Sequence, residues 1–260
     1  MKRTKFFVAT LFTSLFACLC MLFSGCQLAL LSPNGSENTS DNISENMSGN
    51  ISEDTVAGVY KTKSVTITQG ETTKELHLGE TEDGVTLTED WMELVLTENG
   101  YGVIIYKPSG YSSKCTWAQS EEDKIVIYEK HSDEWVFEYN GSTITQQIAN
   151  GDYSEKWVLE KKRLFLTAAQ AQVVGYYQYK SVTSSSGETI DMSEEDESII
   201  LAEDGCAYFL EEFNLLFVGT WTQTKNGKLS LTARGDTFIG ECDGTKITAT
   251  LDGKTYVFEK

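Results

Sequence analysis

One unit repeated twice makes up most of this sequence, and the duplication constrains the fold more than any other feature. Segments of residues 56–162 match segments of residues 173–260 in the same order, and six ordered matches predict two homologous domains. The matched pairs are 58–66 with 175–183, 94–100 with 199–205, 115–117 with 219–221, 124–127 with 228–231, 140–145 with 243–248 and 157–161 with 256–260. A linker at 163–172 joins the domains, and the run 167–172 could start a short helix.

Each unit has the sequence pattern of an antiparallel sheet. Short alternating runs rich in Val, Ile, Thr, Tyr and Trp are separated by glycine-containing turns. For example, residues 91–96 reach a turn at Asn99-Gly100, and the chain returns as 103–106. We therefore expect an all-β protein with seven to ten short strands in each unit, closed as a small barrel or as a sandwich.

The N-terminus reads as a secretory signal. Positive charges at Lys2, Arg3 and Lys5 precede an apolar run that ends in Ser24-Gly25, directly before Cys26. This resembles the lipobox of bacterial lipoproteins, although Phe23 stands where such signals usually have Leu. The resemblance implies that residues 1–25 are removed and that Cys26 carries a diacylglyceryl anchor. The alternative is an uncleaved transmembrane anchor, because residues 6–23 are largely apolar.

A four-residue repeat follows, with Asn first and Ser third in every copy of 34–53. Such a segment has almost no aliphatic side chains to bury, so we expect residues 26–55 to be a disordered tether. Together these features predict an extracytoplasmic protein that is lipid-anchored to the cell membrane.

Charge narrows the range of partners. The net charge is −18, and loss of the three positive charges of the signal would lower it to −21. Nucleic acid and unassisted docking on anionic lipid both need clustered Lys and Arg, so neither is an expected partner. Neutral or cationic ligands, basic partners and simple solubility remain open.

Three cysteines belong to the repeated units. No two of them have C-x-x-C spacing and the chain has only two histidines, so we expect no thiolate metal or redox site. Cys206 and Cys242 fall in the same unit and could form one disulfide in an oxidising location. Cys115 would then be a buried small apolar residue.

A search for catalytic constellations finds none. Gly-rich phosphate loops and the metalloprotease and serine hydrolase signatures are missing from the sequence. We interpret His77 and His131 as surface residues. Paired carboxylates could still hydrolyse glycosidic bonds, but no pair of the 39 acidic residues stands out.

The combination of strands is similar to the lipocalin-like domains of bacterial lipoproteins, especially those of Gram-positive bacteria. This resemblance rests on a Gly-x-Tyr opening, a Gly-Thr-Trp strand at 219–221, a Lys-Leu-x-Leu strand at 228–231 and a closing strand at 256–260. In the first unit Cys115 replaces a glycine, and residues 67–90 are longer than their counterpart. The resemblance implies tandem up-and-down barrels on a lipid tether, without implying a reaction or a cofactor.

We therefore expect a non-catalytic surface lipoprotein that binds a small ligand or a protein. The alternatives are an envelope-glycan hydrolase and a purely structural spacer. Aromatics that recur in both units suggest a repeated core: Tyr60, Trp117 and Trp157, with Tyr177, Trp221 and Tyr256. Tyr101, Tyr111 and Trp135 have no such counterparts, so they are the candidate ligand-binding residues.

Overall fold

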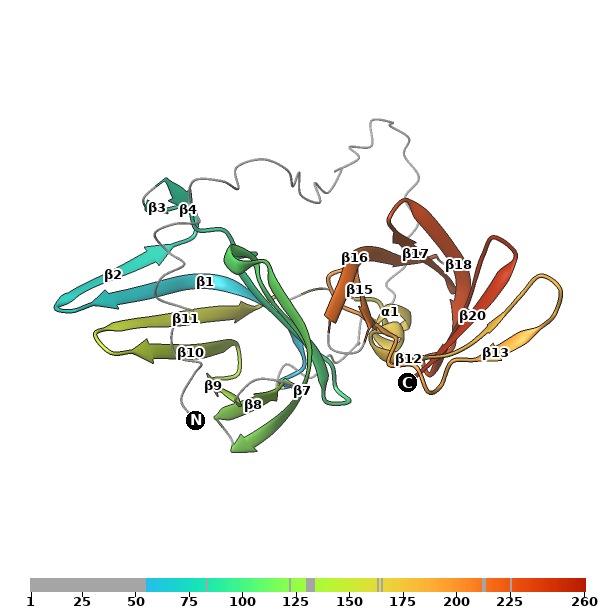
Figure 1. Cartoon of the computed structure of the whole chain (residues 1–260), viewed down its shortest axis with the longest axis horizontal. Helices are drawn as coiled ribbons and strands as arrows, with labels where there is room; N and C mark the ends of the chain where they lie inside the picture. The colour runs from blue at the N-terminus through green and yellow to red at the C-terminus, as the bar shows by residue number, and fades with distance from the viewer. Residues whose placement is uncertain are drawn as a thin grey trace, which may run out of the picture. The chain divides into compact units, whose positions relative to one another are not determined.

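The structure, a computed structural model, describes residues 55–260 apart from 83, 122, 130–133, 163, 165, 212, 213 and 225. The described chain forms two closed eight-stranded antiparallel barrels within one compact unit. Figure 1 shows the strands of barrel 1 in blue through green to yellow-green and those of barrel 2 mainly in orange to red. The predicted all-β class and the tandem arrangement are confirmed, and each unit closes as a barrel.

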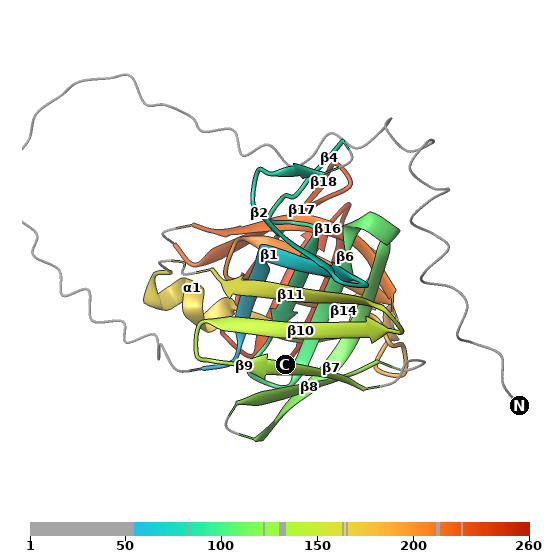
Figure 2. The same cartoon turned by 90° about the vertical axis from the view of Figure 1, so that its left-hand side faces the viewer.

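Barrel 1 is an up-and-down barrel in which neighbours in sequence are neighbours in the sheet, and β11 closes on β1. In Figure 2, β1, β11, β10 and β9 lie side by side in its wall. Strand β2 (Thr72–His77) pairs with the far half of β1, and β3 (Thr81–Glu82) pairs with β4 (Val85–Thr86). The barrel strands are β1 (Gly58–Gln69), β5 (Met92–Leu96), β6 (Tyr101–Tyr106), β7 (Tyr111–Glu121), β8 (Lys124–Tyr128), β9 (Trp135–Tyr139), β10 (Thr143–Asn150) and β11 (Tyr153–Lys161), with a 3-10 turn, η1 (Lys107–Ser109), between β6 and β7.

Barrel 2 repeats this order, and β20 closes on β12. A short strand, β13 (Thr189–Asp191), takes the place of β2. Its barrel strands are β12 (Gly175–Thr183), β14 (Ser198–Leu201), β15 (Cys206–Glu211), β16 (Asn214–Gln223), β17 (Lys228–Ala233), β18 (Asp236–Cys242), β19 (Lys246–Leu251) and β20 (Lys254–Glu259).

The duplication extends to backbone irregularities. The closing pair of barrel 1 is shifted by a bulge between Thr62 and Ser64, and that of barrel 2 by a bulge between Tyr179 and Ser181. The turns after β5 and β14 also match, because Gly100 and Gly205 adopt φ of 82° and 81°. Left-handed backbone of this kind favours glycine, so the Asn-Gly and Asp-Gly signals predicted both turns correctly.

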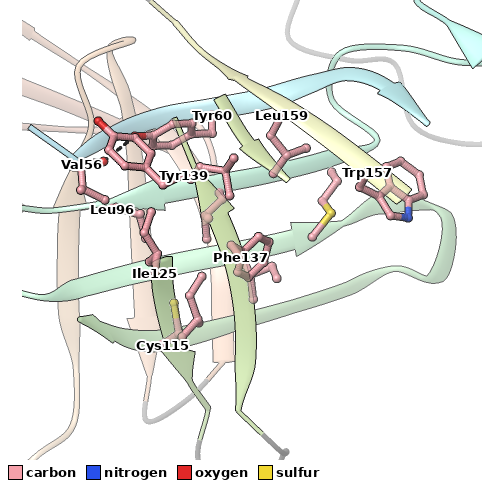
Figure 3. Close-up of a cluster of buried hydrophobic side chains, with 14 of the residues drawn as sticks. Val56, Tyr60, Leu96, Cys115, Ile125, Phe137, Tyr139, Trp157 and Leu159 are labelled. Atoms are coloured by element: carbon pink, nitrogen blue, oxygen red, sulfur yellow. Dashed lines mark hydrogen bonds between the residues drawn. The ribbon is translucent and has the colours of Figure 1, made fainter. Parts of the chain in front are cut away.

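Equivalent aromatic side chains fill the two interiors, as predicted. The hydroxyl of Tyr60 donates a 2.6 Å hydrogen bond to the carbonyl of Val56, and Tyr177 does the same to Val173. Figure 3 shows the Tyr60 contact beside the rest of the barrel 1 core. Clusters of this kind fill small eight-stranded barrels, which have room inside for side chains but little more.

Trp117 and Trp221 occupy equivalent positions and make the same contacts. The indole N–H of Trp117 donates to the carbonyl of Thr97 at 3.0 Å, and that of Trp221 to Ala202 at 2.8 Å. Each ring packs against the core of its own barrel. The two tryptophans therefore mark the same layer of both barrels.

The linker forms the predicted short helix, α1 (Ala168–Val173). Thr167 caps its N-terminus, because its hydroxyl accepts from the backbone N–H of Gln170 while the Gln170 side chain accepts from the Thr167 N–H. This reciprocal pair is a capping box. The helix ends in Val173, which belongs to the core of barrel 2.

Candidate functional site

The two barrels differ most at the end where their first strand finishes. In barrel 1 the segment between β1 and β5 covers this end, since Leu87 is 1% exposed and Leu76 is also buried. Both side chains belong to the same apolar cluster as Met92 and Trp157. The extra length at 67–90 that the sequence showed therefore serves as a cover of the barrel.

The corresponding segment of barrel 2 is shorter and covers less. Residues 184–197 connect β12 to β14, and they contribute Met192, which is half-buried against the core. Ile190 on β13 is instead 55% exposed. This end of barrel 2 therefore keeps apolar surface in contact with solvent.

Five aromatic side chains gather at this end of barrel 2. The ring centroids of Phe209 and Phe217 are 4.5 Å apart and stacked, and Phe238 meets Tyr256 edge-on at 5.5 Å. Tyr179 lies 6.2 Å from Tyr256. All but Tyr179 are half-buried. We call this group the aromatic rim: Tyr179, Phe209, Phe217, Phe238 and Tyr256.

The aromatic rim is only partly specific to the second unit, because Tyr256 and Phe238 stand where barrel 1 has Trp157 and Trp135. By strand register, Phe217 stands where barrel 1 has Ser113, and Phe209 where it has Ile104. Each of these replacements adds a large ring on the inward face of its strand. The rim thus gains aromatic surface at the end that lacks a cover.

A cation already lies on one of these rings. The guanidinium carbon of Arg234 is 4.3 Å from the ring centroid of Phe217, a cation–π distance. Arg234 adopts φ of 52° in the turn between β17 and β18, and such backbone is unusual for a residue with a side chain. This turn therefore holds a positive charge over the rim.

Carboxylates lie at the same end. The carbonyl of Glu197 accepts from the backbone N–H of Tyr179 at 3.0 Å, and Glu211 follows Phe209 by two residues on β15. Burial raises the pKa of Glu197, and repulsion by Glu211 and Glu195 raises it further. The repulsion around Glu197 therefore favours a positive charge near this carboxylate.

Of the three predicted ligand-binding residues, Tyr101 packs between the barrels. Its ring stacks on that of Tyr176 with centroids 3.9 Å apart, and the Lys114 ammonium lies 5.8 Å from the Tyr101 centroid. Lys114 also donates to the hydroxyl of Tyr176 at 3.1 Å. Tyr101 is thus part of a contact between the two units.

Tyr111 and Trp135 lie elsewhere. The hydroxyl of Tyr111 donates to a carboxylate oxygen of Glu129 at 2.6 Å, and burial together with this bond raises the pKa of Tyr111 to about 12. Trp135 is half-buried and packs on the core of barrel 1. The structure therefore does not bring Tyr101, Tyr111 and Trp135 together into one site.

A buried carboxyl group, that of Glu93, lies at the contact between the barrels. Burial raises the pKa of Glu93, although Lys61 opposes the shift from 3.7 Å and Tyr208 donates a hydrogen bond to the carboxylate. Burial lowers the pKa of Lys61, but the negative charges of Glu93 and Asp204 outweigh this effect, so the Lys61 pKa is raised. Around them pack matched residues of both units: Val59 and Tyr176, Val95 and Ile200, and Val103 and Tyr208. Equivalent faces of the barrels therefore meet around a buried ion pair.

The disulfide between Cys206 and Cys242 is not formed, which corrects the prediction. Cys206 lies beside the residues that join the barrels, whereas the Cys242 sulfur lies 3.4 Å from the Tyr177 hydroxyl inside barrel 2. The thiols occupy opposite faces of the barrel wall. Cys115 is a buried free thiol, and burial raises its pKa well above the ordinary value.

Other predicted features are partly outside the described residues. Cys26, the signal, most of the tether and His131 lie there. His77 is exposed, with its Nε2 atom 4.0 Å from Glu75, in agreement with a surface role. Among described residues, no cluster of His, Cys, Asp and Glu is arranged to hold a metal, and no helix is long and apolar enough to span a bilayer.

A hollow of about 270 Å³ lies on the wall of barrel 2, away from the aromatic rim. It is lined by Lys228, Ile239, Gly240, Glu241, Thr248 and Thr250. These side chains are mixed in polarity and include no aromatic ring, so the hollow offers less apolar contact than the rim.

Comparisons with known proteins identify no family. No family model and no curated protein matches the chain. Among solved structures, the chain is similar to the glycoside hydrolase family 43 YxiA protein from Bacillus licheniformis, with 14% identity and a TM-score of 0.25. The match covers 70% of this chain and 43% of that protein, so the chain spans less than half of its length. At this TM-score the likeness carries no argument about fold or function.

Proposed function

We propose that this chain is a lipid-anchored extracytoplasmic lipoprotein with tandem lipocalin-like barrels, and that it binds a partner without turnover. The observation that carries the proposal is the aromatic rim of barrel 2. Barrel 1 has Ser113 where barrel 2 has the half-exposed ring of Phe217, and Leu87 of the longer segment packs on this end of barrel 1. Exposed aromatic surface of this kind costs solubility and is typical of interaction sites.

The filled interiors favour a protein or peptide partner over a small buried ligand. Tyr177 and Trp221 occupy the centre of barrel 2, together with Leu229 and Leu231. Packing of this kind leaves binding to the surface and the rim. The closed up-and-down topology supports the lipocalin-like resemblance, and the Ser24-Gly25-Cys26 sequence supports the lipid anchor.

The geometry offers less support for the hydrolase alternative. Glu93 and Asp204 both lie within salt-bridge distance of Lys61, at the packed contact between the barrels. Glu155 is buried and accepts from the indole N–H of Trp157 at 2.9 Å inside barrel 1. A glycosidase instead needs two carboxyls flanking a sugar in an accessible cleft.

The test uses the chain from Gln27 onward, which keeps every described residue. It is incubated with envelope glycans, peptides and ester substrates, and both bound and released material are measured. We expect saturable binding without product, and weaker binding by Phe217→Ser than by Leu216→Ser. Leu216 is a matched control because it is exposed on the opposite face of the same strand. Turnover that disappears when one Asp or Glu is replaced would overturn the proposal.

A further inference from the structure

Barrel 1 indicates what kind of ligand fits this end of the fold. Its cover is an extended segment of chain whose backbone is held at Leu87, because Leu87 N–H donates to Glu80 and the Leu87 carbonyl accepts from Gly79. Leu87 itself packs on the barrel core. A leucine side chain presented by extended backbone therefore fits this end of the fold.

Barrel 2 has the receiving surface without the cover. Phe209 and Phe217 are both half-buried, so each presents part of its ring to solvent. An open aromatic surface suits an extended peptide, which covers area by lying across it. Branched aliphatic side chains pack well on such rings.

Charge selects among peptides. Glu197, whose carbonyl accepts from the Tyr179 N–H at 3.0 Å, is repelled by Glu211 and Glu195, and an added positive charge would relieve that repulsion. Arg234 shows that the face of Phe217 accepts a guanidinium. An acidic peptide would instead meet like charges on a chain whose net charge is −18.

We propose that the aromatic rim of barrel 2 binds an extended basic peptide segment, with a branched aliphatic side chain on the rings and a lysine or arginine facing Glu197 and Glu211. The proposal rests on the proposed function and names the chemistry of its partner. It assigns barrel 1 a closed end and barrel 2 the recognition end.

The probe is a short synthetic peptide of alternating lysine and leucine, added to the chain from Gln27 onward. Two matched peptides replace every lysine by glutamate or every leucine by alanine. We expect each replacement to weaken binding by about tenfold or more, and salt near 0.5 M to weaken binding of the basic peptide. Amide hydrogen exchange should show protection confined to β15–β18 and the turns that join them.

Two kinds of variant locate the site. Phe209→Ile with Phe217→Ser installs the residues of barrel 1, and we expect binding to fall about tenfold. Glu197→Gln with Glu211→Gln leaves the rings intact and should remove most of the salt dependence. Leu216→Ser is the control, and thermal melting shows that each variant is folded.

Several outcomes would overturn the inference. Equal binding of the acidic peptide, or of the peptide without leucine, would remove the proposed chemistry. Full competition by tetraethylammonium would instead indicate a small-cation site. Saturable binding of an envelope component that both double variants leave unchanged would reject this site while leaving the proposed function standing. No binding of any component would reject the proposed function itself.

Discussion

Replacing Trp221 by alanine tests whether the duplicated core is organised as described. Trp221 is 3% exposed and is the one tryptophan of barrel 2. A buried tryptophan removes about 200 Å² from water, which corresponds to about 5 kcal/mol at 25 cal/mol per Å². Residual burial in the unfolded chain lowers this figure by about a quarter. The orphaned carbonyl of Ala202 adds about 1 kcal/mol.

We therefore expect Trp221→Ala to destabilise barrel 2 by about 3–5 kcal/mol. Trp117→Ala should destabilise barrel 1 by less, because Trp117 is half-buried. Trp221→Phe keeps an aromatic ring but loses the indole N–H, so it should cost about 1–2 kcal/mol.

Amide hydrogen exchange followed by mass spectrometry measures this cost separately for each barrel. Peptides from β14–β17 should lose protection in Trp221→Ala, while those from β5–β8 should change little. Ile239→Ala is the control, because Ile239 is 49% exposed and should change stability by less than about 0.5 kcal/mol. If Trp221→Ala lowered the free energy of unfolding of barrel 2 by less than about 1 kcal/mol, the assignment of this ring to the core would be refuted.

Three further predictions follow from the cover, the ion pair and the anchor. Leu87→Ala should cost about 2–5 kcal/mol and raise hydrogen exchange in barrel 1 alone; unchanged exchange at β5 and β11 would mean that the cover is not part of the core. The raised pKa of Glu93 means that the folded protein holds a proton more tightly than the unfolded chain, so this group's stabilising contribution is present below about pH 4.5 and is lost as the pH rises. Glu93→Gln, which can still accept from Tyr208, should therefore gain stability relative to the wild type as the pH rises above about 4.5 in urea titrations, and a difference that stays constant with pH would contradict this. Cys26→Ala should abolish labelling by a clickable fatty acid and block signal cleavage, whereas persistent labelling would exclude Cys26 as the anchor.

Much of the fold could be predicted because its signals are local. Strand alternation and the Asn99-Gly100 and Asp204-Gly205 turns specify hairpins from neighbouring residues alone, and the repeat supplies the same pattern twice. The equivalence of Trp117 and Trp221 followed from alignment of the copies. Closure as a barrel required the resemblance, since the pattern by itself also fits a sandwich.

The candidate site could not be predicted in the same way. The sequence favours Tyr101 as a ligand-binding residue because it lacks a counterpart in the second unit, but its ring stacks on Tyr176 of that unit, and no local pattern encodes this contact. The predicted disulfide does not form, because Cys206 faces out of the barrel wall and Cys242 faces into the barrel. Which way each side chain faces depends on the register of its strand. A signal for the aromatic rim was present: Phe217 replaces Ser113 in the aligned copies, at the end where residues 67–90 have no full counterpart.

The shared bulge has a consequence for how the chain folds. Each barrel closes only when its first strand meets its last, and because both closing pairs carry the same irregularity, the first strand of one unit can register with the last strand of the other. Such cross-closure would trap the chain in a swapped, misfolded state. The closing pairs differ in volume, since Thr62 lies opposite Leu159 whereas Tyr179 lies opposite Phe258. A tyrosine in the place of Thr62 would overfill the first interior, so divergence of these side chains gives each copy its own closing partner.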